Sequence, residues 1–290
     1  MKAAFLPDRG VVRLTGDDAR TLLNGLVTTD VTRLTPQAAR FGALLTPQGK
    51  IVTDFLLAEA ADGSLILDCP RDLAGPLATK LGFYKLRAKV IIENQSDALG
   101  ILAVWDGTPA TPPANAFADP RQPDLGLRVV VAPDKAAACI AEIGATPSGD
   151  DAYEAHRVAC GVPQGGIDFT YGDAFPHEAN MDRLKGVDFD KGCYIGQEVV
   201  SRMQHRGTAR TRTVRLAFEG AAPPPGTAVT AGGKPLGTLG TIAGGKALGL
   251  LRIDRVNDAL AAGQPIEAGA TRLVIAEPED IALPAKGLRV

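Results

Sequence analysis

The sequence has few of the residues that build metal centres, disulfide frameworks or membrane spans. Its 290 residues include only four cysteines, three histidines and one tryptophan. No two cysteines form a C-x-x-C pair, and their spacings match no common zinc pattern. No apolar run approaches the ~18 residues that a membrane helix needs. Pro7, Asp8 and Arg9 interrupt the N-terminus before it could form the apolar core of a signal peptide. We therefore expect no metal site, no membrane contact and a cytoplasmic location.

The charge balance gives no global signature of a nucleic-acid-binding protein. The net charge is -2 at pH 7, so any such site must be a local patch. One candidate is the stretch Val199–Phe218, which has no acidic residue. Its arginines are Arg202, Arg206, Arg210, Arg212 and Arg215. They could grip phosphates, RNA or the polyglutamate tail of a cofactor. The stretch lacks the interleaved aromatic residues that stack single-stranded bases, and a solvated charged face is equally open.

The apolar pattern predicts a mixture of strands and helices in the first 190 residues. Strands are expected at 11–16, in three pieces within 41–70, and at 84–95, 99–105 and 124–133. Helices are expected from residue 17 onward and at 71–84, 134–145 and 151–162. Pro76 should be tolerated only within about the first turn of its helix. The short connections favour antiparallel pairing, and the regular βαβ alternation of a doubly wound sheet is missing.

The residue pattern of the sequence changes near residue 208. Residues 163–190 are turn-rich and irregular, and a loop of that length in a compact protein is usually functional. From Thr211 onward, short β-type runs alternate with glycine and proline, which predicts a small all-β sandwich or barrel. We therefore expect an α+β domain over 1–207, with subdomains of about 1–150 and 151–207, and a β domain over 208–290.

The segment KGCYIGQEVVSRMQHRG, from Lys191 to Gly207, carries the clearest chemistry. Cys193 lies between two glycines that allow sharp turns. A helix starting near Gly196 would favour its thiolate through the exposed N–H groups of the first turn. A nucleophile paired with His205, a redox-active thiol and a buried structural thiol all remain open. A metal site formed with other cysteines and histidines has suitable residue types but no recognised spacing.

Polar side chains are concentrated just before this segment. FPHEANMDRLKGVDFDKGC places Glu178, Asn180 and Asp182 close together in an irregular stretch. Such side chains orient polar ligands through hydrogen bonds, and they also decorate ordinary loops. Their position beside the cysteine favours a binding role.

The octapeptide KGCYIGQE, Lys191–Glu198, resembles the signature of the YgfZ family of folate-binding proteins. These proteins are relatives of the aminomethyltransferase (T-protein) of the glycine cleavage system. The resemblance extends to PHEANMDRLKGVDFDKGC and RMQHRGTARTR on either side of the octapeptide, and to LTGDDARTLLNGLVTTDV, ALLTPQGKIVTDFLL and YKLRAKV in the N-terminal half. It therefore covers nearly the whole chain.

This resemblance implies ferredoxin-like α+β subdomains around a central folate channel, followed by a small C-terminal β-barrel. It implies tetrahydrofolate or a derivative as cofactor. It also implies support for the assembly or repair of iron–sulfur proteins, including enzymes that modify tRNA. Iron–sulfur proteins or their assembly machinery are the implied partners, and tRNA or tRNA-modifying enzymes are further candidates.

The resemblance also assigns roles to individual residues. Cys193 is implied as the functional thiol, and the rest of its motif is Lys191, Gly192, Tyr194, Gly196, Gln197 and Glu198. The candidate folate contacts are Tyr84, Arg87, Glu178, Asn180, Arg202 and Arg206. Lys191, Arg202 and Arg206 would supply positive potential for the thiolate or for the glutamate tail. Asp97 falls near the T-protein's catalytic aspartate and is a second catalytic candidate.

One position departs from the T-protein. Where that enzyme has a glutamate that holds the pterin ring, the matching run HRVACG has Ala159. A pterin ring would lose a carboxylate partner there, at a cost of about 1–3 kcal/mol. An aminomethyl transferase therefore stays an alternative, as does a non-enzymatic module that binds RNA or a scaffold protein. Whether the chain turns over a substrate is open.

Overall fold

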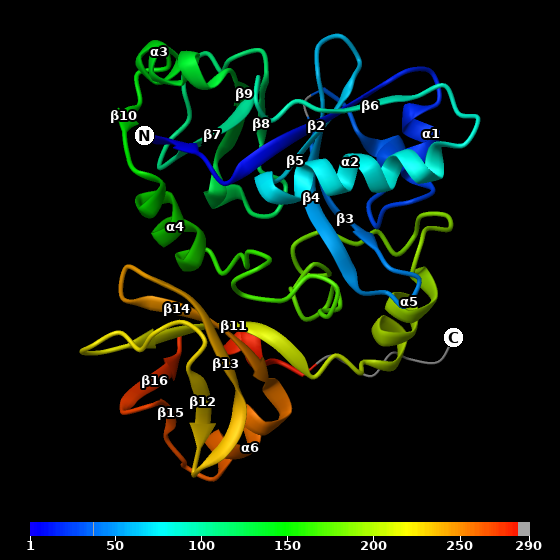
Figure 1. Ribbon diagram of the computed structural model, residues 1–290. Coiled ribbons are helices and arrows are strands. Elements are labelled where there is room, and N and C mark those ends of the chain that lie inside the picture. The colour runs from blue at the N-terminus through cyan, green and yellow to red at the C-terminus, as the bar shows by residue number, and fades with distance from the viewer. Residues whose placement is uncertain (37, 284–290) are drawn as a thin grey trace. The chain divides into compact units, whose positions relative to one another are not determined.

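The computed structural model describes residues 1–36 and 38–283, which fall into two compact units (Figure 1). The first unit comprises Met1–Thr46, Val52–Tyr153 and Arg183–Ile195. The second comprises Pro47–Ile51, Glu154–Asp182 and the chain from Gly196 onward. The polypeptide therefore passes between the units several times, and each unit is described by itself.

One five-stranded sheet of the first unit carries most of the apolar core. Its strands, in spatial order, are β3 (Arg40–Leu45), β4 (Ile51–Glu59), β5 (Leu65–Pro70), β2 (Arg9–Thr15) and β6 (Ile91–Asn94). The pairs β4–β5, β5–β2 and β2–β6 are antiparallel. Helix α2 (Arg71–Lys85) packs against this sheet through Ala74, Leu77 and Leu81, and α1 (Ala19–Asn24) adds Leu23 to the same core.

The second sheet of this unit also has five strands. Their order is β10 (Thr146–Pro147), β1 (Lys2–Leu6), β7 (Gly100–Trp105), β9 (Leu127–Val131) and β8 (Ala116–Ala118). Only the β1–β10 pair is parallel. Helix α3 (Ala136–Glu142) packs its Ala136 and Ile140 against this sheet. Helix α4 (Asp150–Ala159) follows β10 and begins at the border of the two units.

A buried ionic network joins the two sheets of the first unit. Arg9 of β2 donates from Nε to the Oδ1 of Asp68 on β5 at 2.6 Å. Arg128 of β9 lies 3.5 Å from Asp68 and 3.3 Å from Asp119, and it donates to the hydroxyl of Tyr153 at 2.6 Å. Cations and carboxylates at the sheet junction thus satisfy one another away from water.

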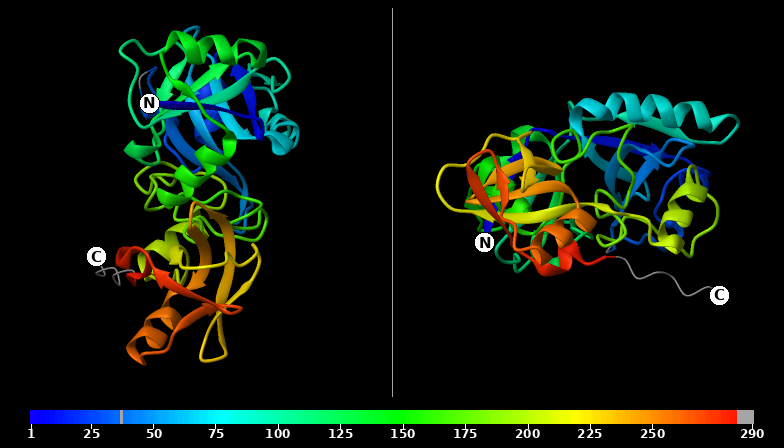
Figure 2. Two further views of the ribbon diagram at one scale, coloured as in Figure 1. Left: turned by 90° about the vertical axis from the view of Figure 1, so that its left-hand side faces the viewer. Right: turned by 90° about the horizontal axis from the view of Figure 1, so that it is seen from below.

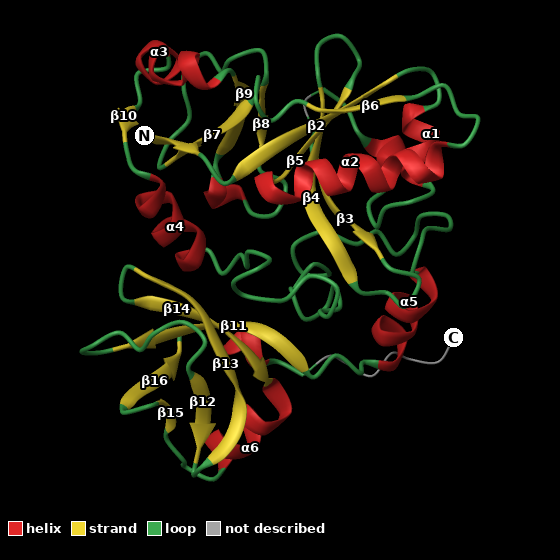
Figure 3. Ribbon diagram, in the orientation of Figure 1, coloured by secondary structure: helices red, strands yellow, loops and turns green. Residues whose placement is uncertain are grey.

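The second unit contains a closed six-stranded barrel (Figure 3). Around the barrel the strands are β11 (Thr211–Phe218), β14 (Lys246–Arg252), β13 (Lys234–Ala243), β12 (Ala228–Ala231), β15 (Ile266–Ala268) and β16 (Thr271–Ile275). Inward residues such as Val214, Leu216 and Leu251 fill its interior, and α6 (Ile253–Ala261) packs Val256 into the same core. The remaining helix, α5 (Gln197–Arg206), precedes β11.

Most of the expected elements are confirmed, including the α+β class, the antiparallel pairings and the barrel. Three details differ. The strand expected over 84–95 is only Ile91–Asn94, because α2 continues to Lys85 and a turn follows. Pro76 lies in the interior of α2 and not in its first turn. The residue is exposed, so its ring lies on the outer face of the helix. Helix α6 was not expected. The domain boundary near residue 208 and the two subdomain ranges stay predictions.

The described helices are short or polar by the standard of membrane spans. Over residues 1–36 and 38–283, none combines the length and the apolar character needed to cross a bilayer. The longest, α2, runs for 15 residues and carries charged residues at both ends.

Candidate functional site

The motif loop is anchored to the first unit by a buried lysine. The side chain of Lys191 is only 7% exposed. Its Nζ donates to the carbonyl oxygens of Asn24, Val27 and Thr29 at 2.7, 2.7 and 2.8 Å. An ammonium has three N–H donors, so all three are satisfied here by the segment that leaves α1. The cation thus fastens the motif loop to that segment.

Burial sets the electrostatics of this anchor. Removal from water lowers the pKa of Lys191 to about 8, and the nearby carboxylates of Asp30 and Asp188 oppose the shift. The ammonium also lies 5.2 Å from the centroid of the Tyr194 ring, in cation–π range. The positive charge expected at this position is present, and it is engaged by backbone oxygens and an aromatic face.

Cys193 lies two residues after this anchor and points outward. Of the four cysteines, all within the described chain, Cys193 alone is exposed, whereas Cys69 is buried. Gly192 is exposed as well, and a Cβ at that position would meet no atom within 4 Å. Tyr194, in contrast, is buried, and its hydroxyl has no hydrogen-bond partner in the part of the chain that the structure describes. In this loop, the exposed Cys193 thus lies between two buried side chains, Lys191 and Tyr194.

Helix α5 begins where the sequence predicted. Gly196 precedes its first residue and has a φ of 81°, a left-handed conformation that favours glycine. In the second unit, the Pro47–Lys50 turn packs against this end of the helix, where a Cβ at Gly49 would lie 3.0 Å from the Cβ of Val199. The first turn of α5 thus starts four residues after Cys193. Gln197 is its first residue, and Glu198 pairs with Arg202 on its exposed face.

The polar segment before the motif forms a second cluster, in the second unit. Burial raises the pKa of Glu178, whose carboxylate accepts the Phe175 N–H at 2.8 Å. Asn180 has a φ of 54° and donates from Nδ2 to the carbonyl oxygen of Thr213 at 2.7 Å. Its Oδ1 is buried and has no hydrogen-bond partner within the described ranges. This cluster therefore offers a buried acceptor that the fold itself does not satisfy.

Two further contacts hold this cluster in place. Asp182 forms a two-pronged ion pair with Arg212 of β11, at 2.6 and 2.9 Å. The same guanidinium donates to the carbonyl oxygen of His177 at 2.9 Å. The Nε2 of His177 lies 3.0 Å from the Oε1 of Gln204 on α5. The segment is thus tied both to the barrel and to α5. No local sequence pattern indicates the roles of His177, Gln204 and Arg212 at this cluster, because their partners are distant in sequence.

The arginine run does not form one continuous basic face. Arg212 and Arg215 are held by Asp182 and Asp280. Arg210 lies 3.6 Å from Asp254, and Arg202 pairs with Glu198. Arg206, exposed on the last turn of α5, makes no ion pair with any described residue. Among the arginines expected to contact a glutamate tail, Arg206 is therefore the one whose charge is not already paired with a described carboxylate.

The remaining candidate residues belong to the first unit. Tyr84, near the end of α2, is half-buried against the main core, and Arg87 is exposed in the turn that follows. Asp97 is fully exposed and pairs with Arg71 at 3.1 Å. Cys193 and Lys191 lie in this same unit, whereas Glu178, Asn180, Arg202 and Arg206 lie in the other. Each unit by itself therefore holds a part of the expected site.

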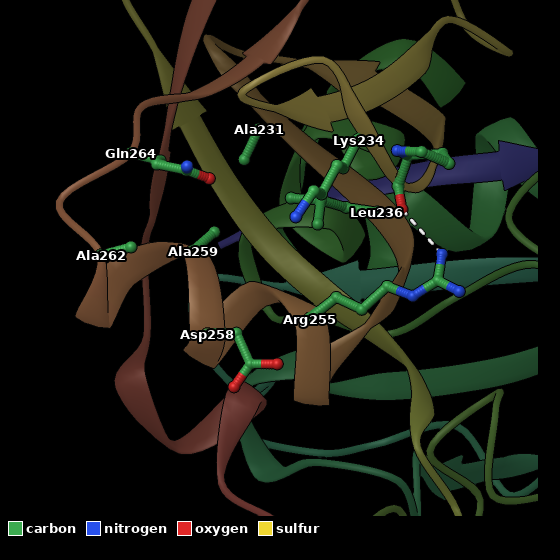
Figure 4. Close-up of a pocket in the computed structure, with 9 residues that line it drawn as sticks. Ala231, Lys234, Leu236, Arg255, Asp258, Ala259, Ala262 and Gln264 are labelled. Carbon is green, nitrogen blue, oxygen red and sulfur yellow. Dashed lines mark hydrogen bonds between the residues drawn. The ribbon is translucent and has the colours of Figure 1, made fainter.

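Two other features bear on ligand binding. Within residues 1–36 and 38–283, no three histidine, cysteine, aspartate or glutamate side chains gather closely enough to hold a metal ion. A pocket of about 570 Å³ opens between α6 and the β12–β13 hairpin of the barrel (Figure 4). Lys234, Arg255 and Asp258 line it, and no residue of the Cys193 motif does.

The C-terminal barrel has a recognisable family. Residues 210–282 match the family model described as the C-terminal beta-barrel domain of CAF17. The chain is 31% identical over 288 residues to the mouse (Mus musculus) iron–sulfur cluster assembly factor IBA57, mitochondrial, covering 88% of this chain and 78% of that protein. The chain belongs to the IBA57 family of iron–sulfur cluster assembly factors.

Other members are similar to a comparable degree. The human (Homo sapiens) IBA57 is 30% identical, with 88% of this chain and 78% of the relative covered. The Mycosarcoma maydis IBA57 homologue is 37% identical over 241 residues, which are 77% of this chain and 59% of that protein. The chain thus spans little more than half the length of that fungal relative. All three relatives are named as mitochondrial proteins. The expectation of a cytoplasmic location is therefore contradicted.

The fold itself is that of an aminomethyltransferase. The glycine cleavage system aminomethyltransferase T from Bartonella henselae superposes with a TM-score of 0.73, covering 98% of this chain and 86% of that chain. The sequence identity is only 15%, so this likeness shows the fold alone. The expected relation to the T-protein fold is confirmed, whereas the relatives found are IBA57 proteins and do not single out the YgfZ family.

Proposed function

We propose that this IBA57-family chain supports iron–sulfur cluster assembly through the thiol of Cys193. The observation that carries the proposal is an exposed cysteine on a loop that is fixed by the buried Lys191 ammonium. The curated relatives are named as iron–sulfur cluster assembly factors, which indicates the pathway. Partners in that machinery follow from the same similarity.

The chemistry of a thiolate suits this cargo. Cysteine thiolates are the usual ligands of iron–sulfur clusters. Cys193 supplies one such ligand, so a transferred cluster must take its other ligands from a second molecule. A rigid loop with an accessible thiol allows that second molecule to approach. The fixed backbone also keeps the sulfur from collapsing into the apolar core.

The direct test is a replacement of the thiol in a strain that lacks its own factor. The Cys193→Ser chain should fail to restore the activity of [4Fe–4S] enzymes, whereas wild type restores it. Cys160→Ser is the matched control, because Cys160 is half-buried and outside the motif. Full restoration by Cys193→Ser would show that the thiol is not the functional group.

We also infer that the chain binds tetrahydrofolate or a derivative, with Glu178 and Asn180 as acceptors for the N–H groups of the pterin ring. The unsatisfied buried Oδ1 of Asn180 and the half-buried carboxylate of Glu178 support this assignment. They provide acceptors in a chain that has Ala159 at the T-protein's glutamate position. Arg206 would meet the charged glutamate tail, and Tyr84 and Arg87 are further candidate contacts. When bound, the cofactor would supply one-carbon units.

Calorimetry tests folate binding separately from thiol chemistry. Wild type should bind tetrahydrofolate, or its 5-formyl or 5,10-methylene form. Glu178→Gln should weaken binding about tenfold, which corresponds to the loss of one charge-assisted hydrogen bond. Glu93→Gln, at an exposed position, should bind as wild type does. If none of the three folates gave a heat of binding, the assignment of a folate site would be refuted.

A YgfZ-type influence on tRNA modification belongs to the same proposal, as an indirect effect. Four of the five arginines in the basic run are engaged by carboxylates, which disfavours direct RNA recognition. Thiomethylated tRNA should therefore fall in parallel with other products of iron–sulfur enzymes. The purified chain should show no salt-sensitive binding to tRNA.

A further inference from the structure

The turn that follows α2 carries two exposed large apolar side chains. Phe83 is 76% exposed and Leu86 is 89% exposed. They are three residues apart, with Phe83 in the last turn of α2 and Leu86 directly after its last residue. Figures 1 and 2 show this turn at the outer edge of the first unit, between α2 and β6. We call Phe83, Leu86 and their flanking cations the turn surface.

The charged residues nearest to these two in the sequence are all positive. The flanking cations are Lys80, Lys85, Arg87 and Lys89. No acidic residue occurs between Asp72 and Glu93. None of the four cations makes an ion pair with a described residue. A chain with a net charge of -2 thus concentrates unpaired positive charge at an apolar site.

The turn is held rigidly in an unfavourable backbone conformation. Leu86 has a φ of 46°, a region that side chains other than glycine rarely occupy. The Lys89 N–H donates to the carboxylate of Asp18 at 2.7 Å, and Ala88 N–H donates to the Lys85 carbonyl at 2.8 Å. Gly16 packs so closely against the Lys89 carbonyl that a Cβ there would collide with it. The fold therefore fixes a leucine where glycine would be easier to accommodate, and leaves its side chain in water.

We propose that the turn surface is a docking site for an acidic partner protein, whose apolar pocket receives Phe83 and Leu86. Exposed apolar groups that are fixed before binding are the usual anchors of protein interfaces, because little conformational entropy is lost on association. The unpaired cations match carboxylates on the rim of such a pocket and speed the encounter. A partner protein fits these features better than a bilayer does, because insertion into lipid requires no fixed geometry of the anchors.

This inference rests on the proposed function, and it assigns the surface at which the second protein of cluster transfer binds. Cys193 supplies a single thiolate, so cluster transfer needs a second protein. The turn surface gives that protein a binding site that does not depend on the thiol. The two roles can therefore be lost independently.

Leu86→Gly is the most informative variant. It removes the anchor and also relieves the left-handed strain, so its unfolding midpoint in urea should equal or exceed that of wild type. Any loss of binding then cannot come from unfolding. Phe83→Ser removes the second anchor. Ile167→Ser is the control, because Ile167 is also an exposed apolar residue, at 53%, in a loop of the other unit.

The partner is captured by a photoreactive residue in the full-length chain. Phe83→p-benzoylphenylalanine should crosslink in cells to a protein of net negative charge, and the same residue at Ile167 should not. The captured protein is then purified and titrated. Leu86→Gly and Phe83→Ser should each weaken its binding at least about tenfold, as truncated interface anchors do. The association rate should fall as salt is raised, because the cations steer the encounter.

Three results would overturn the proposal. The captured protein could bind Leu86→Gly as tightly as it binds wild type. The chain could bind vesicles of phosphatidylserine and phosphatidylcholine through Leu86 while position 83 crosslinks to no protein. Leu86→Gly could also mature [4Fe–4S] enzymes fully while Cys193→Ser does not, in which case the docking site is wrong and the thiol function stands. Full activity of Cys193→Ser would instead refute the thiol function, whatever the turn surface binds.

Discussion

At the scale of single residues, the motif owes its geometry to buried polar groups that face backbone atoms. Lys191 donates to three carbonyl oxygens at and just beyond the end of α1. His177 joins the polar segment to α5 through Gln204. Lys191 thus acts on the backbone beside α1, and His177 acts on α5. Both are therefore expected to act by positioning, and their removal should first be visible in stability.

Lys191→Met should destabilise the first unit by about 2–4 kcal/mol, because three buried carbonyl oxygens lose their donor. Urea denaturation measures the change. Lys135→Met is the matched control, since Lys135 is exposed and contacts only Asp134 at the surface, and it should change stability by less than about 0.5 kcal/mol. A Lys191→Met chain as stable as the control would show that the three hydrogen bonds contribute little.

Acid should weaken the anchor at His177. Burial lowers the pKa of this histidine below its ordinary value of about 6.5. Between the folded and the unfolded pKa values the unfolded chain therefore binds more protons, so stability falls as the pH drops below about 6.5. His177→Asn should flatten this part of the curve of unfolding free energy against pH. His205→Asn, at an exposed position on α5, is the matched control.

At the scale of elements, turns that need glycine decide where helices and strands begin. Gly196 allows α5 to start within the motif, at Gln197, and Gly16 allows the turn after α2 to pack against the β2–α1 connection. Sequence patterns located these helices, including the end of α2 to within one residue, but the strand expected from residue 84 begins only at Ile91. The apolar run after Tyr84 looks like a continuous strand, while the hydrogen bonds of the turn at Leu86 depend on Asp18, which is distant in sequence.

Gly16→Ala tests this dependence on a close backbone approach. The new Cβ would collide with the Lys89 carbonyl oxygen, and the φ of 110° is itself unfavourable for alanine. We expect a loss of about 3 kcal/mol or more. Gly63→Ala is the control, because Gly63 has a φ of 80° but a Cβ there meets nothing within 4 Å. It should cost only about 1 kcal/mol in the same thermal or urea denaturation experiment.

At the scale of the whole molecule, polar networks hold sheets and segments together where apolar packing alone would not fix their register. In the first unit, Asp119 accepts from Arg121 at 2.6 Å and lies 3.3 Å from Arg128. In the second, Arg157 and Asp168 join the loop after α4 to Thr241 of the barrel. Carboxylates buried in this way make the fold sensitive to acid.

Asp119→Asn should destabilise the first unit by about 3 kcal/mol, because it leaves buried guanidinium groups without their counter-charge. Burial by itself raises the pKa of Asp119, but the two arginines together outweigh it and hold that pKa at about 2, below its usual value near 3.8. The stabilisation is thus present above pH 4 and is lost as the pH falls toward 2. Wild type should show this acid loss more steeply than the variant in urea titrations. Asp134→Asn, at the surface, is the matched control.

Prediction from sequence was strongest where local pattern and local geometry agree. The strands around the Pro47–Lys50 turn, the start of α5 and the short strands of the barrel were all located from spacing and glycine content. Cys193 was singled out from its flanking residues. The partners of Lys191, Asn180 and Arg212 could not be predicted, because each is 30 or more positions away in the chain.

The sequence by itself determined the α+β class, the C-terminal β domain and the motif cysteine, since these depend on periodicity and on neighbouring residues. Only the tertiary structure decided that Lys191 is a buried anchor, that most of the arginine run is neutralised by carboxylates, and that Leu86 is fixed in water in a left-handed conformation. Whether a charged side chain is paired, and whether a side chain is exposed, depends on which distant segments contact each other. Those contacts form because folding buries apolar surface and pairs the polar groups that are buried with it.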